Sequence, residues 1–293
     1  MSNDNEGATW RDRLFVGMQY LLPQHALARV VYRATRSTAP RWKNFLIRSF
    51  LRGFDVDMEE AREPDPLAYP SFNAFFTRAL RPDARPVVPT PDAVASPVDG
   101  MVSQVGRIDS NLLLQAKGHT YSLDALLAGD LELESRLRGG EFATIYLAPY
   151  NYHRIHMPLA GRVVATTHVP GHLFSVNTVT ARHVPELFAR NERVVCVFET
   201  GVGLMVMVLV GALFVGSMET VWAGEITPAR RRAPTRLPTQ AVGLERGAEM
   251  GRFNMGSTVI VLFEANRVRW SETLAPGELV KMGERVGTLI GPA

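Results

Sequence analysis

Three stretches near the start of the chain carry apolar residues at helical spacing, with arginines and lysines between them. They span residues 10–22, 27–36 and 41–52, and Pro23 and Pro40 separate them. This pattern predicts three short amphipathic helices with bulky apolar faces and basic polar faces. Such helices are typical of proteins that bind a membrane interface, although packing on the protein's own core is the commoner fate of an amphipathic helix. The pattern alone leaves both interpretations open.

The rest of the chain has a different pattern of hydrophobic and polar residues. One short helix is expected near Phe72–Leu80, in a connection rich in proline and charge, and another at Ser122–Leu127. Further along, short β-rich runs alternate with turns rich in glycine and proline. The predicted strands are Gly100–Ile108, Glu141–Leu147, Gly161–Val169, Val194–Glu199, Leu204–Glu219, Ser257–Phe263 and Arg267–Trp270. Strands and helices do not alternate regularly, which excludes a doubly wound sheet. We therefore expect a mainly β (α+β) fold, with a helical region over 1–55 and a β-rich body over 56–293.

One apolar run, Val202–Met218, raises the question of a membrane span. It lies at the short end of the ~17–25 residues that a helix needs to cross a bilayer, and it is rich in valine and contains three glycines. Buried strands joined by a turn are the better interpretation, so no transmembrane helix is expected. The later segment 227–250, with Arg230, Arg231, Arg232 and three prolines, is expected to be a long solvated loop.

The net charge of +3 is unevenly distributed. Residues 1–54 hold nine Lys and Arg against three Asp and Glu, which gives +6, and the other residues hold 23 against 26, which gives −3. A basic segment suggests a polyanionic partner, and its amphipathic pattern favours an anionic membrane over nucleic acid. The acidic start, with Asp4 and Glu6 and no apolar run behind it, argues against a signal or transit peptide. The single cysteine, Cys196, excludes an intramolecular disulfide and a cysteine-based metal site.

Three short motifs carry candidate chemistry. Gly256-Ser257 precedes an apolar strand; a glycine leaves its carbonyl carbon open to attack, and a serine hydroxyl becomes a nucleophile when a base takes its proton. His153 and His156 are candidate bases, and Asp99 supplies a carboxylate on a turn. The two histidines have no matching partners for a metal site. Taken separately, each motif is also explained by an ordinary turn, a structural histidine or a capping aspartate.

Together with other motifs, these residues resemble the phosphatidylserine decarboxylase family over nearly the whole chain. The matching segments are Gln19–Pro23, Phe75–Arg78, Ser96–Gly100, Gln115–His119, Tyr152–Pro158, Leu173–Asn177, Phe188–Arg193 and Val221–Gly224. The family usually carries Leu-Gly-Ser-Thr at its cleavage site. Here Met255 replaces the leucine, a conservative apolar change that leaves the Gly256–Ser257 bond untouched.

The resemblance implies two reactions at one position. In the first, Ser257 attacks the carbonyl of Gly256, His156 acts as the general base, and Asp99 orients His156 and stabilises its charged form. This self-cleavage yields a β chain, 1–256, and an α chain, 257–293, that begins with a covalent pyruvoyl group derived from Ser257. In the second, the pyruvoyl group forms a Schiff base with phosphatidylserine and yields phosphatidylethanolamine and CO2. His153 is a candidate proton donor for that step.

The resemblance also carries expectations about architecture and partners. The catalytic body is expected to be β-sandwich-like, with a helical membrane-docking region before it. The expected partners are phosphatidylserine and an anionic membrane surface, with no nucleic acid and no metal, at the cytoplasmic side of the cell membrane as a peripheral protein. The α and β chains are expected to form a heterodimer, with a dimer of heterodimers as a further option. Two alternatives stay open: a pyruvoyl enzyme that acts on a soluble amino acid such as aspartate, and a non-catalytic membrane-binding β module.

Overall fold

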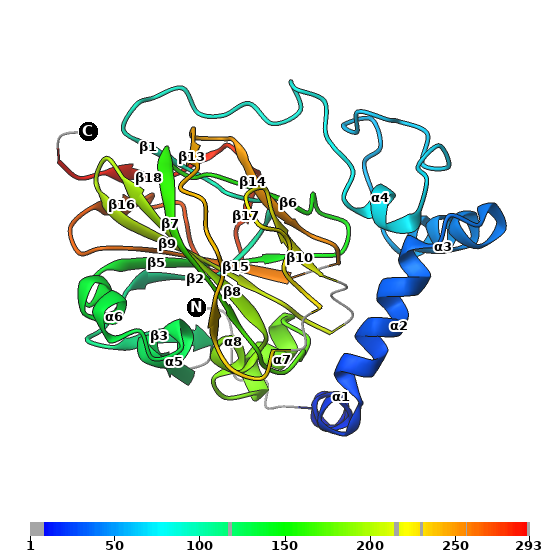
Figure 1. The fold of residues 1–293 in the computed structure, drawn as a ribbon, viewed down its shortest axis with the longest axis horizontal. Coiled ribbons are helices and arrows are strands. Elements are labelled where there is room, and N and C mark those ends of the chain that lie inside the picture. Colours follow the sequence, from blue (N-terminus) through cyan, green and yellow to red (C-terminus); the bar gives the residue numbers. More distant parts are fainter. Residues whose placement is uncertain (1–8, 117–118, 214–216, 229–230, 256, 292–293) are drawn as a thin grey trace.

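A large antiparallel sheet forms the centre of the molecule (Figure 1). The computed structural model describes residues 9–116, 119–213, 217–228, 231–255 and 257–291, and Ser257 by its backbone alone. Across this sheet the strands are β12 (Thr235–Arg236), β7 (Gly161–Val169), β8 (Arg193–Thr200), β9 (Gly203–Val210), β15 (Ser257–Phe263), β5 (Glu141–Leu147), β2 (Gly100–Arg107) and β17 (Leu279–Val280), with β13 (Gly243–Leu244) also paired to β7. The valine-rich middle strands β9 and β15 are buried along their length, which is why they are almost continuously apolar.

Smaller sheets complete the β-rich body. One contains β11 (Gly224–Glu225), β10 (Met218–Thr220), β14 (Glu249–Phe253) and β6 (Arg154–His156). Another contains β1 (Ala93–Ala95), β18 (Arg285–Leu289) and β16 (Val268–Trp270), and a hairpin joins β3 (Leu112–Ala116) to β4 (His119–Ser122). The mainly β prediction is confirmed. The run Leu204–Glu219 divides into β9 and β10, and the expected loop 227–250 contains short strands, because its residues pair with the edge of β7.

The three predicted N-terminal helices are present. They are α1 (Trp10–Leu21), α2 (Gln24–Arg36) and α3 (Pro40–Gly53). Figure 1 shows them along one side of the body, next to α4 (Phe72–Phe76). Ile47 of α3 is buried in a cluster with three phenylalanines of α4, so part of each apolar stripe packs internally. Other positions on the same helices stay exposed, notably Leu21 at 86% and Trp10 at 69%.

Four further helices are short. They are α5 (Leu123–Leu127), α6 (Leu131–Leu137), α7 (Thr178–His183) and α8 (Leu187–Arg190). Only α5 was expected; the periods of α6, α7 and α8 did not stand out from the surrounding sequence, because each spans two turns or fewer. Within the described ranges, no helix combines the length and apolar character that crossing a bilayer requires. Cys196 is fully buried in β8, and burial raises the pKa of its thiol, as expected for an inert cysteine.

Two buried glutamines anchor the corner between α1 and α2 to the body. The side-chain oxygen of Gln19 accepts the N–H of Ser175 at 2.7 Å, and that of Gln24 accepts the N–H of Leu173 at 2.7 Å. The Gln24 amide also donates to the carbonyl of Gln19 at 2.9 Å. The Leu173 bond is buried and the Ser175 bond is partly buried, so the glutamines satisfy donors that have little or no access to water. The helical region is therefore fixed to the body at this corner.

Replacing Gln24 with alanine is expected to lower the free energy of unfolding by about 1–3 kcal/mol, because the N–H of Leu173 loses its acceptor. Equilibrium unfolding in urea measures this change. Arg29→Ala, an exposed change on the same helix, is the matched control and is expected to alter the free energy by less than about 0.5 kcal/mol. Equal effects of the two changes would contradict the anchoring role of Gln24.

Candidate active site

The predicted cleavage site lies where the chain passes between two sheets. β14 pairs with β6, with Arg252 opposite Arg154, and β15 pairs with β5, with Ser257 opposite Leu147. Residues 254–256 connect these two strands, so the strand pairing on both sides fixes the ends of the connection. Gly256 lies outside the described residues. The backbone of Ser257 begins β15, as the sequence predicted for this strand.

His156 is the last residue of β6 and is held from both sides of its ring. Its Nδ1 lies 2.8 Å from the carbonyl of Gly247, and its Nε2 lies 3.0 Å from the hydroxyl of Tyr152. A carbonyl can only accept a hydrogen bond, so Nδ1 carries the proton and Nε2 presents its lone pair to the Tyr152 hydroxyl. Burial lowers the pKa of His156, and the Gly247 carbonyl opposes that effect. The ring is therefore neutral at neutral pH, with a basic nitrogen available.

The backbone conformation of Gly247 places its carbonyl within hydrogen-bond distance of Nδ1 of His156. Its φ is +81°, in the left-handed region, and an added Cβ would lie 2.6 Å from a methyl carbon of Val87. Both features favour glycine at this position. The backbone N–H of Gly247 donates to the carbonyl of Met157 at 2.8 Å, and the N–H of Met157 donates to the carbonyl of Ala248 at 2.9 Å, so the same turn is fixed against the end of β6.

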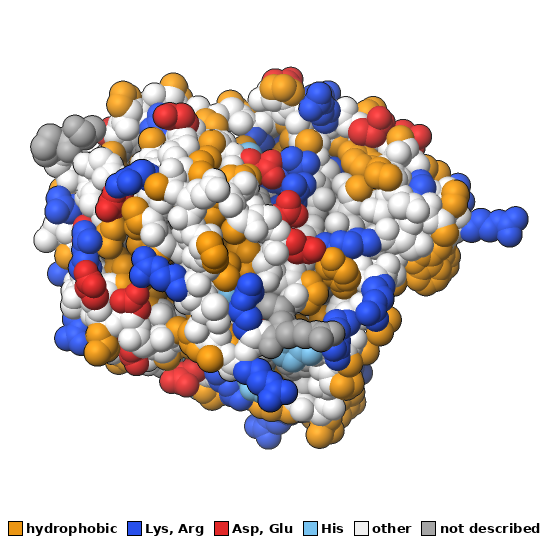
Figure 2. All heavy atoms as spheres, viewed as in Figure 1, with side chains coloured by type: hydrophobic (Ala, Val, Ile, Leu, Met, Phe, Trp, Pro, Cys, Tyr) orange, Lys and Arg blue, Asp and Glu red, His pale blue; other side chains and the backbone are white. Residues whose placement is uncertain are grey.

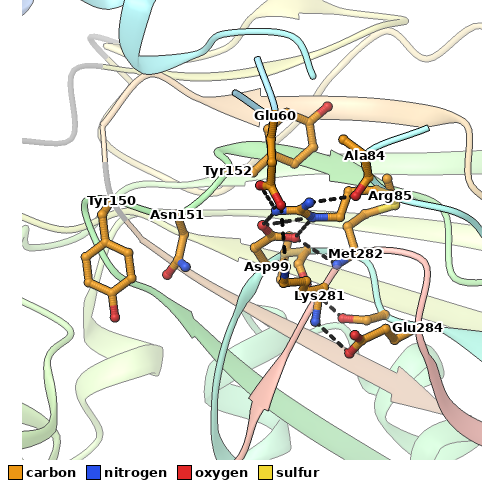
Figure 3. A network of polar contacts seen from close by, with 12 residues as sticks. Glu60, Ala84, Arg85, Asp99, Tyr150, Asn151, Tyr152, Lys281, Met282 and Glu284 are labelled. Atoms are coloured by element: carbon orange, nitrogen blue, oxygen red, sulfur yellow. Dashed lines mark hydrogen bonds and ion pairs between the residues drawn. The ribbon is translucent and has the colours of Figure 1, made fainter. Parts of the chain in front are cut away.

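Asp99 is buried in a network of charged groups, shown in Figure 3. Its carboxylate accepts from Nε and Nη2 of Arg85, at 2.9 and 2.6 Å, and from the backbone N–H of Met282 at 2.8 Å. Arg85 also pairs with Glu60 at 2.7 Å. Burial lowers the pKa of Arg85, but the two carboxylates outweigh it and raise that pKa above its ordinary value. The guanidinium therefore stays charged and holds Asp99 in a fixed orientation.

The structure brings Asp99 and His156 into one region without a described hydrogen bond between their side chains. The backbone N–H of His156 donates to the carbonyl of Pro97 at 2.8 Å, which places β6 beside the turn that carries Asp99. Among the described contacts, the Asp99 carboxylate accepts hydrogen bonds from Arg85 and Met282. The ring of His156 makes its hydrogen bonds with Tyr152 and Gly247. Asp99 nevertheless raises the pKa of His156 through its charge, as a smaller effect than burial.

His153 has a different environment. It is fully buried, its Nδ1 donates to the carbonyl of Asn151 at 2.8 Å, and its ring packs on Phe76 with 4.1 Å between ring centroids. Its Nε2 is buried and has no hydrogen-bond partner among the described residues. Burial lowers the pKa of His153 to about 3. In this form of the protein, Nε2 is therefore an unprotonated acceptor.

An apolar cavity of about 320 Å³ borders this region. Phe50 of α3 and Phe54, which follows α3, line one part, Leu147 at the end of β5 lines another, and Met255 of the predicted cleavage segment also contributes. The cavity thus connects the helical region to the residue that precedes Gly256. Its lining is suited to hydrocarbon groups.

A second cavity, of about 210 Å³, lies on the polar side of the site. Asp99, Arg85, Tyr152, Arg78 and Lys281 are among the residues that line it. Arg78 is buried, donates to the carbonyl of Tyr150 at 3.2 Å, and lies over the ring of Phe75. No group of three or more His, Cys, Asp or Glu side chains in the described part of the chain is arranged to hold a metal ion.

The direct partners of the candidate residues carry little or no signal in the sequence. Arg85 stands in a stretch of prolines and charges that gave no local signal, and its contact with Asp99 depends on the fold. The Gly247 carbonyl is a backbone group, which no motif identifies. Tyr152 was within a quoted motif, and its position four residues before His156 was the one available signal.

Comparisons with known proteins place the chain in a family. A family model described as "Phosphatidylserine decarboxylase" matches residues 72–288, and one described as "PSD" matches residues 14–55. The chain is 53% identical over 291 residues to a protein of Bordetella bronchiseptica named phosphatidylserine decarboxylase proenzyme, covering 97% of this chain and 96% of that protein. Proteins with the same name are 53% identical in Azotobacter vinelandii, over 94% of this chain and 98% of the relative, and 52% identical in Methylococcus capsulatus, over 94% and 96%. These matches over nearly the full length show that the chain belongs to the phosphatidylserine decarboxylase family, a family of carboxy-lyases.

Proposed function

We propose that this chain is the precursor of a pyruvoyl-dependent phosphatidylserine decarboxylase that cleaves itself between Gly256 and Ser257. The relatives are named proenzymes for phosphatidylserine decarboxylation. The observation that carries the proposal is the state of His156: a buried, neutral imidazole with Nδ1 anchored and Nε2 presented to a hydroxyl group. The hydroxyl belongs to Tyr152, and a neutral imidazole with an unprotonated Nε2 is the form that a general base needs to activate a serine.

The proposed cleavage is an acyl shift followed by an elimination. His156 accepts the proton of the Ser257 hydroxyl, whose oxygen bonds to the carbonyl carbon of Gly256 while the peptide C–N bond breaks and the freed nitrogen is protonated. Loss of the Cα proton of residue 257 expels Gly256 as a carboxylate and leaves dehydroalanine. Addition of water then releases ammonia and leaves a pyruvoyl group. The products are the β chain, 1–256, and the α chain, 257–293, of 37 residues.

In this scheme the orientation and the charge of His156 are supplied by different groups. Gly247 and Tyr152 set the orientation of the ring. Asp99, held by Arg85 and Met282, contributes a negative charge that stabilises the protonated ring when the serine proton arrives. An oriented carboxylate has a comparable effect on the histidine of a hydrolase triad. Asp99 thus keeps its place in the proposal as a stabiliser of charge.

The pyruvoyl ketone supplies the electron sink that decarboxylation of an amino acid requires and that none of the twenty side chains provides. Ser257 is its source. The apolar cavity beside Met255 is suited to hydrocarbon near the reacting position, which favours a lipid over a soluble amino acid such as aspartate. His153 is proposed to carry a proton during decarboxylation. Since its pKa is lowered to about 3 in this form, its Nε2 must first accept the proton that it later donates.

The N-terminal helices are proposed to dock the enzyme on an anionic membrane. Figure 2 shows hydrophobic and basic side chains side by side along the edge where Figure 1 places α1, α2 and α3. Trp10, Leu14, Leu21 and Phe45 are exposed there, and residues 1–54 carry +6. Exposed bulky apolar groups among arginines suit the boundary between acyl chains and anionic headgroups. This peripheral attachment would place the substrate at the apolar cavity.

The decisive experiment measures whether the chain is cleaved and whether the α chain carries a reactive carbonyl group. The purified wild-type protein is expected to consist of two chains, with the α chain starting in a pyruvoyl group, whereas Ser257→Ala is expected to remain one chain of 32.4 kDa. His156→Ala is expected to slow cleavage by roughly 10²–10⁴-fold, because the general base is lost. Intact mass spectrometry measures all three proteins.

Phosphatidylserine and cyanoborohydride are then added to each protein. The adduct is expected on the first residue of the wild-type α chain, with loss of activity, and no adduct is expected in Ser257→Ala. An adduct on a lysine such as Lys281, or complete processing of Ser257→Ala, would contradict the proposal. A single unprocessed wild-type chain that still binds vesicles would favour the non-catalytic membrane module.

The pH dependence of self-cleavage tests His156 as the base. The reactive form is the neutral ring, and burial lowers its pKa from 6.5, with the charges of Glu249, Arg154 and Asp99 as smaller influences. The rate constant is therefore expected to reach a plateau as pH rises and to fall on acidification with a midpoint below pH 6.5. Burial raises the pKa of Tyr152, so its hydroxyl stays protonated throughout this range. A rate that still rises through pH 8 would exclude a neutral His156 as the base.

Substitutions on exposed apolar positions test docking without removing the helices that pack on the body. Leu21→Glu and Phe45→Glu are each expected to weaken binding to phosphatidylglycerol vesicles by at least about tenfold, since a buried apolar side chain is worth ~1.5–3 kcal/mol. Leu131→Glu, at a leucine of α6 whose exposure of 69% lies between those of Phe45 and Leu21, is the control and should bind normally. Co-sedimentation in low and high salt measures binding. If Leu21→Glu and Phe45→Glu bind as the wild type does, this face is not the docking surface.

A further inference from the structure

Asn254, two residues before Gly256, has all its polar groups held by two neighbours. Its backbone N–H donates to the carbonyl of Ser217 at 2.9 Å, and its carbonyl accepts from the side chain of Asn73 at 3.0 Å. Its side-chain amide donates to the hydroxyl of Ser217, and its side-chain oxygen accepts from Asn73 at 3.3 Å. Asn254 is buried, with 2% of its surface exposed. These contacts fix the backbone just ahead of the proposed cleavage site.

The hydroxyl of Ser217 connects this arrangement to the N-terminal helices. It accepts a hydrogen bond from Nη2 of Arg36, at the end of α2, at 2.9 Å. The same nitrogen pairs with Glu225 of β11 at 2.6 Å. The guanidinium also lies 3.7 Å from the ring centroid of Tyr32, whose hydroxyl donates to Glu225 at 2.9 Å. Arg36 is thus held by a carboxylate and an aromatic ring while it donates to Ser217.

The position of the scissile peptide depends on these neighbours. Gly256 has no side chain with which to make contacts of its own, so its place follows from the residues on either side. On one side, β15 is paired with β5. On the other, Met255 packs in the cluster of α3 and α4, and Asn254 is bound to Ser217 and Asn73. A nucleophile and a carbonyl carbon react efficiently only when held close to the attack geometry.

We propose that Arg36 of α2, acting through Ser217 and Asn254, is a positioning residue for self-cleavage. The inference rests on the proposed cleavage between Gly256 and Ser257 and goes beyond it, because it gives the helical region a part in maturation in addition to docking. Ser217 and Asn73 belong to the same set of positioning residues. None of the four takes or gives a proton in the reaction.

The test measures the first-order rate constant of cleavage after cell-free synthesis of the full chain, with and without each substitution. Asn254→Ala is expected to slow cleavage by roughly 10²-fold, the usual effect of misplacing a reacting group. Arg36→Ala is expected to slow it by about tenfold, since a charge-assisted hydrogen bond is lost. Arg36→Lys, which retains the charge without the planar guanidinium, is expected to give an intermediate rate constant.

The double variant Arg36→Ala/Asn254→Ala separates positioning from general destabilisation. If Arg36 acts through Asn254, the double variant cleaves no more slowly than Asn254→Ala alone, whereas independent effects would multiply. Arg162→Ala, which breaks the exposed ion pair of Arg162 with Glu199, is the matched control and should cleave at the wild-type rate. Each substitution is repeated in the Ser257→Ala chain, where an unchanged thermal midpoint shows that the fold is retained.

The outcomes distinguish the inference from the proposed function. If the wild-type chain does not cleave between Gly256 and Ser257, the proposed function fails. If the wild-type chain cleaves there and Arg36→Ala cleaves equally fast, or the two single effects multiply in the double variant, only the positioning role of Arg36 is overturned.

Discussion

The pairing of β14 with β6 and of β15 with β5 sets the ends of the segment in which the proposed cleavage occurs. Strand pairing leaves few positions for a connection of three residues, 254–256, because both ends are fixed by backbone hydrogen bonds. The same pairing brings His156, at the end of β6, opposite Glu249 of β14. The candidate base, His156, is thus placed by the pairing of β6 with β14. The candidate nucleophile, Ser257, is placed by the connection that follows β14 and by the start of β15. Side chains refine this placement but do not create it.

Burial is the second constraint. It lowers the pKa of both His156 and His153, but the consequence for the proposed reactions differs between them. Desolvation keeps both rings neutral, which prepares His156 to accept a proton and makes His153 a poor donor until it has received one. The difference lies in the partners: Nε2 of His156 faces a hydroxyl, and Nε2 of His153 has no described partner. Two histidines three residues apart therefore enter the proposed reactions at different stages, because their surroundings differ.

The sequence predicted the parts of the fold that rest on long, clear patterns. Glu141–Leu147 and Gly161–Val169 were predicted to the residue, since buried strands bounded by turns leave a strong signal. Short helices such as α8 gave none. At the site, the motifs identified Asp99, His153, His156 and Ser257 as candidates, whereas the pairing of Asp99 with Arg85 depends on tertiary folding. The resemblance implies that Asp99 orients His156 and stabilises its charged form; the described hydrogen bonds of the His156 ring go to the Gly247 carbonyl and the Tyr152 hydroxyl, which no motif predicts.

The N-terminal region illustrates why a single pattern can support two interpretations at once. An amphipathic helix that only bound a membrane would leave its whole apolar face free, and one that only packed on the core would leave none. Here Ile47 is buried against α4 while Phe45, two residues earlier, is 57% exposed. The helices therefore have an inner face that contacts the residues around Met255 and an outer face available to a lipid surface. Because both faces belong to the same rigid helix, α3, which is proposed to take part in docking, also lines the cavity beside the proposed cleavage site.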